Sequence, residues 1–243
     1  MANLQWHIGC SGFHYKEWKE QFYPKGLPQR LWLDYYCQHF NTLELNVTFY
    51  RFPQLSFLLG WYQKTPAHFT FAVKAPRLIT HYKKFVDTMV LLADFYNTIQ
   101  KGLQEKLAAV LFQLPAQISF SEELLQKIVD QLDPAFKNVV EFRHSSWWQP
   151  KVYETLARRH ISFCSISHPH LPDNVISNTD TIYYRFHGVP QLYYSAYDKN
   201  FLQQVITAIQ NAKQTKQAFI YFNNTAQTAA IQNAQYVQQF VMQ

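Results

Sequence analysis

The chain has 243 residues, of which 48% are hydrophobic and only 16% are charged, and its formal net charge is +6 at pH 7. This composition is too apolar for a disordered chain, and a chain of this length can bury a substantial core without disulfides. The longest apolar runs, such as residues 89–93, are far too short to cross a bilayer. We therefore expect one globular domain over residues 1–243 with no membrane contact.

The three cysteines, Cys10, Cys37 and Cys164, are too scattered for a disulfide framework or a paired zinc-ligand spacing. Their odd number and the lack of a signal peptide favour a reducing, cytoplasmic location. The positive charge alone is weak evidence for a nucleic-acid partner, because no basic cluster exceeds two residues.

Short apolar runs rich in β-forming residues recur along the whole chain, and each predicts a buried strand. They cover residues 6–10, 42–45, 70–74, 108–113, 138–141, 162–166, 181–186 and 218–222. Amphipathic stretches that predict helices lie between them, at residues 31–38, 55–62, 86–99, 121–132, 150–156, 198–209 and 228–242. Ser121 and Asp198 are placed to cap two of these helices. The segment between residues 166 and 181 reads mostly as loop.

Eight strands that alternate with seven or eight helices in about 250 residues are typical of a (β/α)8 TIM barrel. A doubly wound open sheet is the alternative, but eight parallel strands there usually need a longer chain. The sequence contains no GxGxxG or P-loop motif, so we predict no nucleotide cofactor. The predicted fold is an α/β single TIM barrel, with one helix short or missing after the sixth strand.

Polar side chains stand at the carboxyl end of most predicted strands, where the functional residues of a barrel are expected. They are Glu44, Asn46, Lys74, Gln113, Glu141, Arg143, His144, Arg185, His187, Asn223 and Asn224. A charged group in an apolar strand costs free energy unless it is paired. Single residues can be explained as structural ion pairs, such as Glu44 with Lys74 or Glu141 with Arg143 or Arg185. The set as a whole predicts a pocket.

The sequence also resembles the family called domain of unknown function 72, the YecE-like TIM-barrel proteins. The segments that carry the resemblance run through nearly the whole chain and include residues 8–13, 44–51, 113–115, 140–147, 184–188 and 221–224. The resemblance implies a barrel with a shared pocket, and it brings no settled activity. The family usually has an acidic residue after the Asn pair, where this chain has Thr225.

Cations outnumber acids among the predicted pocket residues, which points to an anionic ligand, because guanidinium groups suit phosphate and carboxylate. Our leading hypothesis is a hydrolase-like or lyase-type enzyme acting on a phosphorylated or nucleic-acid-derived substrate. Glu44 or Glu141 would be its general base and His187 or His144 its acid. The predicted substrate-binding residues are Asn46, Tyr50, Arg51, Lys74, His81, Gln113, Arg143, Trp147, Arg185, Asn223 and Asn224.

Two alternatives come from other functional classes. The charge and the aromatic residues fit a non-enzymatic protein that binds nucleic acid or an anionic metabolite. A metal-dependent phosphodiesterase would use Glu44, Glu141, His144 and His187 as ligands. We rank it lower and predict no metal site, because four cations oppose a divalent ion and no HxH or HExxH spacing is present.

Overall fold

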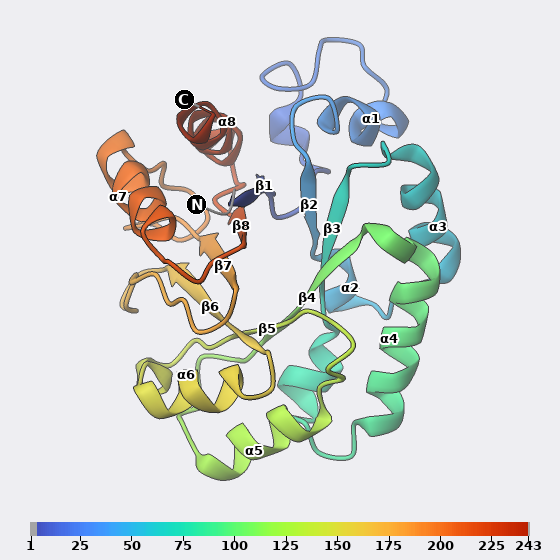
Figure 1. Cartoon of the computed structure of the whole chain (residues 1–243). Coiled ribbons are helices and arrows are strands. Elements are labelled where there is room, and N and C mark those ends of the chain that lie inside the picture. Colours follow the sequence, from blue (N-terminus) through green and yellow to red (C-terminus); the bar gives the residue numbers. More distant parts are fainter. Residues whose placement is uncertain (1–3, 243) are drawn as a thin grey trace.

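In the computed structural model, which describes residues 4–242, eight parallel strands alternate with helices to form a TIM barrel (Figure 1). The strands are β1 (Gln5–Cys10), β2 (Thr42–Leu45), β3 (Thr70–Lys74), β4 (Leu107–Gln113), β5 (Asn138–Glu141), β6 (Ser162–Ser167), β7 (Thr181–Phe186) and β8 (Gln217–Phe222). Every bound lies within one residue of the predicted one, because strands buried on both faces are continuous apolar runs.

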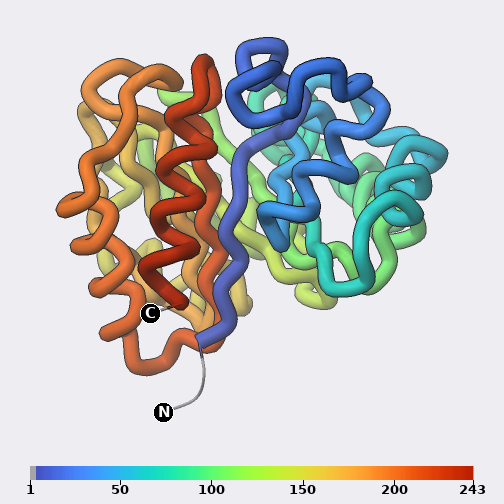
Figure 2. Tube along the Cα trace, turned by 90° about the horizontal axis from the view of Figure 1, so that it is seen from above, coloured from blue at the N-terminus to red at the C-terminus, as the bar shows by residue number. Residues whose placement is uncertain are grey.

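The outer layer consists of α1 (Trp32–Tyr36), α2 (Val47–Tyr50), α3 (Leu55–Lys64), α4 (Met89–Leu103), α5 (Glu122–Gln131), α6 (Pro150–Ala157), α7 (Lys199–Gln210) and α8 (Ala229–Val241). The predicted caps are confirmed: the Ser121 side chain accepts a hydrogen bond from Leu124 N, and that of Asp198 accepts one from Phe201 N. Residues 168–180, between β6 and β7, contain no helix, as predicted. Helix α8 runs beside β1, so the first strand and last helix are neighbours (Figure 2).

Side chains inside the barrel form a core separate from the larger one between strands and helices. Small residues from β3 and β4, Ala72 and Ala109, share this interior with the aromatic rings of Tyr183, Phe219 and Tyr221. Since alternate residues of a strand point to the same side, Arg185 also faces inward, two positions after Tyr183. Side chains therefore fill the barrel interior as far as the layer that contains Arg185, near the carboxyl ends of the strands.

The barrel closes between β1 and β2 through side chains rather than through a regular ladder. One backbone bridge joins Ser11 to Glu44. Below it, Asn41 accepts a hydrogen bond from Ile8 N and donates one to Trp6 O. The Tyr36 hydroxyl accepts from Cys10 N and donates to Thr42 O. We call these contacts the β1–β2 seam. They occupy backbone groups that a neighbouring strand would otherwise pair.

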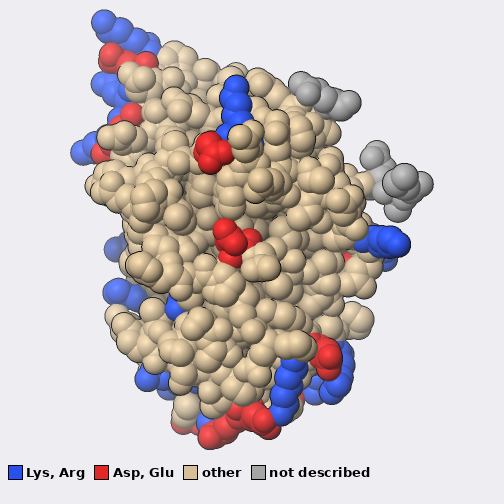
Figure 3. Space-filling model, turned by 90° about the vertical axis from the view of Figure 1, so that its left-hand side faces the viewer, with Lys and Arg blue, Asp and Glu red and all other residues tan. Residues whose placement is uncertain are grey.

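The side of the molecule on which α7 lies carries few charged groups (Figure 3). The sequence of α7 has Lys199 as its single charged residue, and α8 has none, since Gln and Asn occupy their polar positions. No helix among residues 4–242 combines the length and the apolar character needed to span a membrane.

Candidate functional site

A buried chain of ion pairs crosses the barrel near the carboxyl ends of the strands. Arg185, from β7, places its Nη2 atom 2.6 Å from Glu44 Oε1 on β2 and its Nη1 atom 2.5 Å from Glu141 Oε2 on β5. All three side chains are at most 1% exposed. The predicted pairing of Glu141 with Arg185 is confirmed, whereas Glu44 pairs with Arg185 and not with Lys74, because β7 supplies an inward-facing guanidinium between the two carboxylates.

Further donors occupy the remaining carboxylate positions. Glu44 accepts hydrogen bonds from Ser11 Oγ and Tyr183 OH, each at 2.6 Å. Glu141 Oε1 accepts one from Arg143 Nε. Burial raises the pKa of Glu141, but the neighbouring Arg143 and Arg185 outweigh it and hold this pKa well below its usual range. Glu141 is therefore an ionised structural partner, and this arrangement disfavours it as a general base.

His187 links the ion pairs to β8. Its Nε2 atom lies 3.1 Å from Arg143 Nη2, and its Nδ1 atom lies 2.9 Å from the Asn223 amide. Burial, followed by the charges of Arg143 and Arg185, holds the pKa of His187 well below its ordinary value. An imidazole nitrogen that accepts from a guanidinium carries no proton. This environment favours a neutral His187 and disfavours it as the general acid, a role that stays a prediction.

Lys74, the last residue of β3, stands apart from this charge-balanced set. Two carboxylates and two guanidinium groups already neutralise one another, so a protonated Lys74 has no counter-charge. Among residues 4–242 no side chain forms a hydrogen bond or ion pair with its Nζ atom, which lies 4.0 Å from the centroid of the Phe49 ring. Burial, and then the charge of Arg185, lower the pKa of Lys74 from 10.5 to about 7. Its amine is therefore partly neutral at physiological pH.

His81 lies beside Lys74 in the π-helical turn Leu78–Tyr82. Its ring meets the Phe49 ring edge-on at 4.9 Å, and Nδ1 lies 2.8 Å from Thr80 Oγ1. Burial, then the charges of Lys74 and Arg77, lower the pKa of His81 to about 4. The half-buried imidazole is therefore neutral, and its free nitrogen can accept a hydrogen bond from a ligand.

Five polar residues at this end of the barrel keep intermediate exposure, and together with the buried Lys74 they form what we call the mouth: Asn46, His81, Gln113, Arg143 and Asn223. Asn46 has a buried Oδ1 atom without a hydrogen-bond partner and lines a hollow of about 400 Å³ with Tyr15 and Trp61. Gln113 Nε2 donates to Leu114 O at 2.7 Å. The mouth therefore presents amines, amides and a guanidinium above carboxylates that are already paired.

Three predicted site residues have structural positions instead. Trp147 is fully buried, stacks on Phe142 with ring centroids 4.0 Å apart, and donates from Nε1 to Ile118 O. Asn224 is also fully buried, and its amide donates to Ser195 O at 2.9 Å. His144 Nδ1 accepts from Ser146 N and so caps the short turn at residues 145–147. The burial of Trp147 and Asn224 disfavours direct contact with a ligand, and their binding role stays a prediction.

Two further predicted residues lie on the rim. Tyr50 is 69% exposed, and the Arg77 guanidinium lies 5.6 Å from the centroid of its ring. Arg51 lines a separate, largely apolar hollow of about 270 Å³ with Phe52 and Phe57. Neither residue joins the ion-pair chain, because both follow β2 on the short helix α2 or just after it.

Sequence reasoning missed several residues that build the site. Ser11 and Tyr183 hold Glu44, Phe49 supports Lys74, and the His168 ring lies 5.7 Å from the His187 ring. The position of Tyr183 was a usable signal, since it precedes Arg185 by two residues on the same strand face. Phe49 and His168 lie in connections, where periodicity gives no indication of direction.

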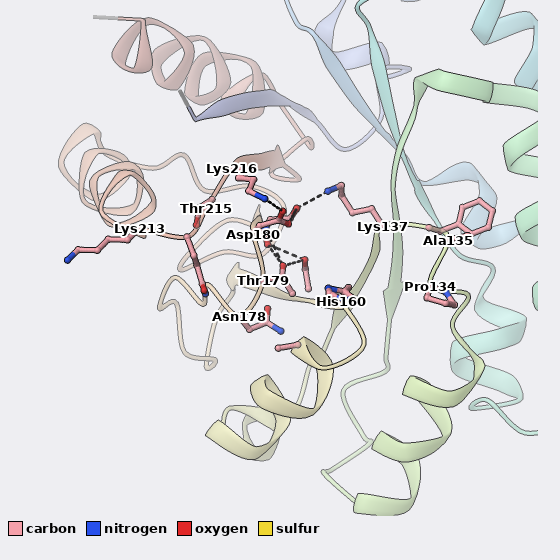
Figure 4. A pocket seen from close by; sticks show the side chains of 15 residues that line it. Pro134, Ala135, Lys137, His160, Asn178, Thr179, Asp180, Lys213, Thr215 and Lys216 are labelled. Carbon is pink, nitrogen blue, oxygen red and sulfur yellow. Dashed lines mark hydrogen bonds and ion pairs between the residues drawn. The ribbon is translucent and has the colours of Figure 1, made fainter. Parts of the chain in front are cut away.

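A separate hollow, of about 800 Å³, lies at the opposite end of the barrel (Figure 4). It is bounded by residues next to the amino ends of β5 to β8. There Lys216 Nζ lies 3.3 Å from Asp180, and Lys137 Nζ donates to Thr181 Oγ1 at 2.8 Å. The first contact joins the neighbouring strands β7 and β8, and the second reaches from β5 to β7 across the end of β6. These contacts therefore contribute to the stability of this end of the barrel.

The donor set does not form a metal centre. Residues 4–242 contain no group of three His, Cys, Asp or Glu side chains arranged to hold a metal ion. Glu44 and Glu141 are each bound to arginine, and His144 caps a turn. His187 contacts Arg143, so each of the four ligands of the phosphodiesterase alternative already has another partner.

Comparisons with known proteins place the fold and the family. UPF0759 protein YecE of Escherichia coli is 31% identical over 117 residues, which are 48% of this chain and 43% of YecE. UPF0759 protein YunF of Bacillus subtilis is 27% identical over 156 residues, 61% of this chain and 54% of YunF. The matched segments thus span about half the length of these curated relatives.

Solved structures match over nearly the full chain. A DUF72 family protein from Thermotoga maritima has a TM-score of 0.89 at 28% identity, covering 98% of this chain and 100% of the other. One from Enterococcus faecalis has a TM-score of 0.83 at 18% identity with complete coverage of both chains, a likeness that concerns the fold alone. The family described as "Protein of unknown function DUF72" matches residues 7–243, and this chain belongs to that family.

Proposed function

We propose that the protein is an enzyme that binds a phosphorylated or nucleic-acid-derived anion at the mouth and that Lys74 is its reactive group. The observation that carries this proposal is the unpaired Lys74 amine beside two carboxylates that are both bound to arginine. A buried cation without a counter-charge is costly, and an anionic ligand would supply the missing charge. The substrate would therefore be recognised by charge before any chemistry takes place.

The roles of the acidic groups change in this proposal. Glu44 and Glu141 position Arg185 and Arg143, and Arg143 offers its remaining guanidinium surface to the anion. The neutral form of Lys74 takes a proton from water or from the substrate, as a hydrolase-like or lyase-type reaction requires. The neutral imidazole of His81 is the second acceptor at the mouth.

Sulfate tests the anion site, because its charge is constant near neutral pH. An anion beside Lys74 raises the pKa of the amine, so binding takes up a proton above about pH 7. Calorimetry should show an affinity that falls by up to about tenfold per pH unit above pH 7. The Lys74→Met variant should lose this slope, and Lys64→Met, which alters an exposed lysine, should keep it. Equal sulfate affinity at pH 6 and pH 9 would refute the site.

A second candidate, a protein that binds single-stranded nucleic acid without catalysis, is favoured by one observation at the rim. Arg77 lies over both Tyr50 and Tyr82, at 5.6 and 5.4 Å, and both rings are mostly exposed. Exposed rings beside a guanidinium suit base stacking.

Fluorescence anisotropy with a labelled oligonucleotide tests this second candidate. Binding should weaken steeply with salt, and Tyr50→Ala should lower the affinity by about 1–3 kcal/mol. The control is Tyr236→Ala, which alters a tyrosine paired with Lys199 on the surface formed by α7 and α8. If the two variants bind equally well, the rim does not bind bases.

A further inference from the structure

We propose that Lys74 is a nucleophile that forms a covalent imine with an aldehyde or ketone carrying a phosphate or carboxylate group. This inference rests on the proposed anion site and names the substrate class and reaction of that site. The geometry that carries it is the position of the amine, at the end of β3, over the Phe49 ring and without a hydrogen-bond partner in the described chain.

The second buried lysine shows what a structural amine looks like in this fold. Lys106 is 5% exposed, and its Nζ atom donates to Tyr62 O at 2.7 Å, to Thr65 O at 2.6 Å and to Thr65 Oγ1 at 3.1 Å. An ammonium group has three donors, so this one is fully used. Lys74 is similarly buried, but no residue in the described chain satisfies its amine. That difference separates an anchoring lysine from one that is free to react.

The charge balance keeps the lone pair of Lys74 available. Arg185 and Arg143 occupy both carboxylates, so neither can hold Lys74 as an ammonium ion. The lowered pKa of about 7 leaves a large share of neutral amine at physiological pH, where an ordinary lysine is almost fully protonated. Lysines desolvated beside other cations are activated in this way.

The reaction balances without an oxidant or reductant. The Lys74 lone pair attacks the carbonyl carbon, and the carbonyl oxygen takes up a proton to give a carbinolamine. Loss of one water molecule then forms the C=N bond. The neutral His81 imidazole, beside Lys74, can carry the proton from nitrogen to the departing oxygen. The imine then takes up one proton from the solvent, and the phosphate or carboxylate group of the substrate neutralises the positive charge that this adds to the mouth.

Reductive trapping tests the proposal. Glyceraldehyde 3-phosphate is incubated with the full chain and sodium borohydride, whose hydride converts an imine into a stable secondary amine. Intact mass and peptide mapping should show one adduct on Lys74, formed at least tenfold faster than with unphosphorylated glyceraldehyde and slowed by sulfate. Lys64→Met should label normally and Lys74→Met should not label at this position. Lys74→Arg should bind sulfate without forming the adduct.

The outcomes separate this inference from the proposed function. If sulfate binds with the expected pH dependence but no Lys74 adduct forms, the imine is wrong and the anion site stands. Loss of both sulfate binding and adduct rejects both proposals. Adducts spread evenly over surface lysines, unchanged by Lys74→Met, also reject the imine. Thermal unfolding of each variant shows whether a negative result comes from a misfolded chain.

Discussion

Arg185 Nη1 lies 2.5 Å from Glu141 Oε2, and neither side chain has more than 1% of its surface exposed. The pair spans neighbouring inward positions of β7 and β5, and the same guanidinium also holds Glu44 on β2. One side chain therefore ties together three strands that are distant in the sequence. Because a buried pair is expensive to break but not especially stabilising as a whole, its main effect is to fix positions at the mouth.

Removal of the Glu141 charge should show how strongly the folded state depends on this ion pair. Glu141→Gln leaves Arg143 and Arg185 without their shared carboxylate, so we expect the free energy of unfolding to fall by about 3–5 kcal/mol. Denaturant titration at neutral pH measures it. Glu123→Gln, which alters an exposed pair with Lys127, should leave stability nearly unchanged. A Glu141→Gln protein as stable as the parent would show that the pair is dispensable.

Lys74 should make stability depend on pH in the alkaline range. Its pKa is 10.5 in an unfolded chain and about 7 in the folded one, so the unfolded state binds more protons between these values. The cost of burying this lysine is complete below pH 7 and disappears as the pH rises. Relative to Lys74→Met, the parent should gain about 1.4 kcal/mol per pH unit above pH 7. A difference that stays constant with pH would contradict this expectation.

Gly9 is required where β1 approaches β2. A Cβ atom there would lie 2.2 Å from Thr42 O and 2.8 Å from Tyr36 OH. Gly9→Ala should therefore lower the midpoint of thermal unfolding markedly. Gly60, inside α3, has open space around the same position, and Gly60→Ala should stabilise the helix by about 0.5–1 kcal/mol. In one calorimetry series, we expect Gly9→Ala to lower the midpoint of thermal unfolding and Gly60→Ala to raise it. A Gly9→Ala midpoint equal to that of Gly60→Ala would show that the β1–β2 seam has room for a Cβ atom at residue 9.

Trp147 should affect folding and not binding. Its ring is buried against Phe142, so Trp147→Ala should cost about 3–5 kcal/mol of stability. At a temperature where the variant is still folded, its sulfate affinity should match that of the parent. A clear loss of sulfate affinity in a folded variant would return Trp147 to the binding site.

The strands were predictable because each is a continuous apolar run, and the strand order of a barrel then follows from chain order. The same reasoning located the ends at which Glu44, Lys74, Glu141 and Arg185 gather. Strand periodicity could not predict which acidic side chain pairs with which cation. Glu44 faces both Lys74 and Arg185 across the interior, and which cation reaches it depends on side-chain direction and on donors such as Tyr183.

The aromatic residues show the same limit. Trp147 follows a polar strand end and Phe49 follows another, so the sequence gives no reason to separate them. In the structure Trp147 turns into the core, whereas Phe49 remains half-buried under Lys74. The difference arises from the path of each connection, which is set by packing against neighbouring helices and not by local periodicity.

The β1–β2 seam has a consequence for aggregation. Regular backbone pairing joins the eight strands into one sheet but leaves β1 and β2 at its two edges. Outermost strands with free backbone groups are templates for pairing with other chains. Asn41 and Tyr36 occupy those groups, so they protect two edges at once. A chain that loses these two side chains would expose both edges and could join with copies of itself.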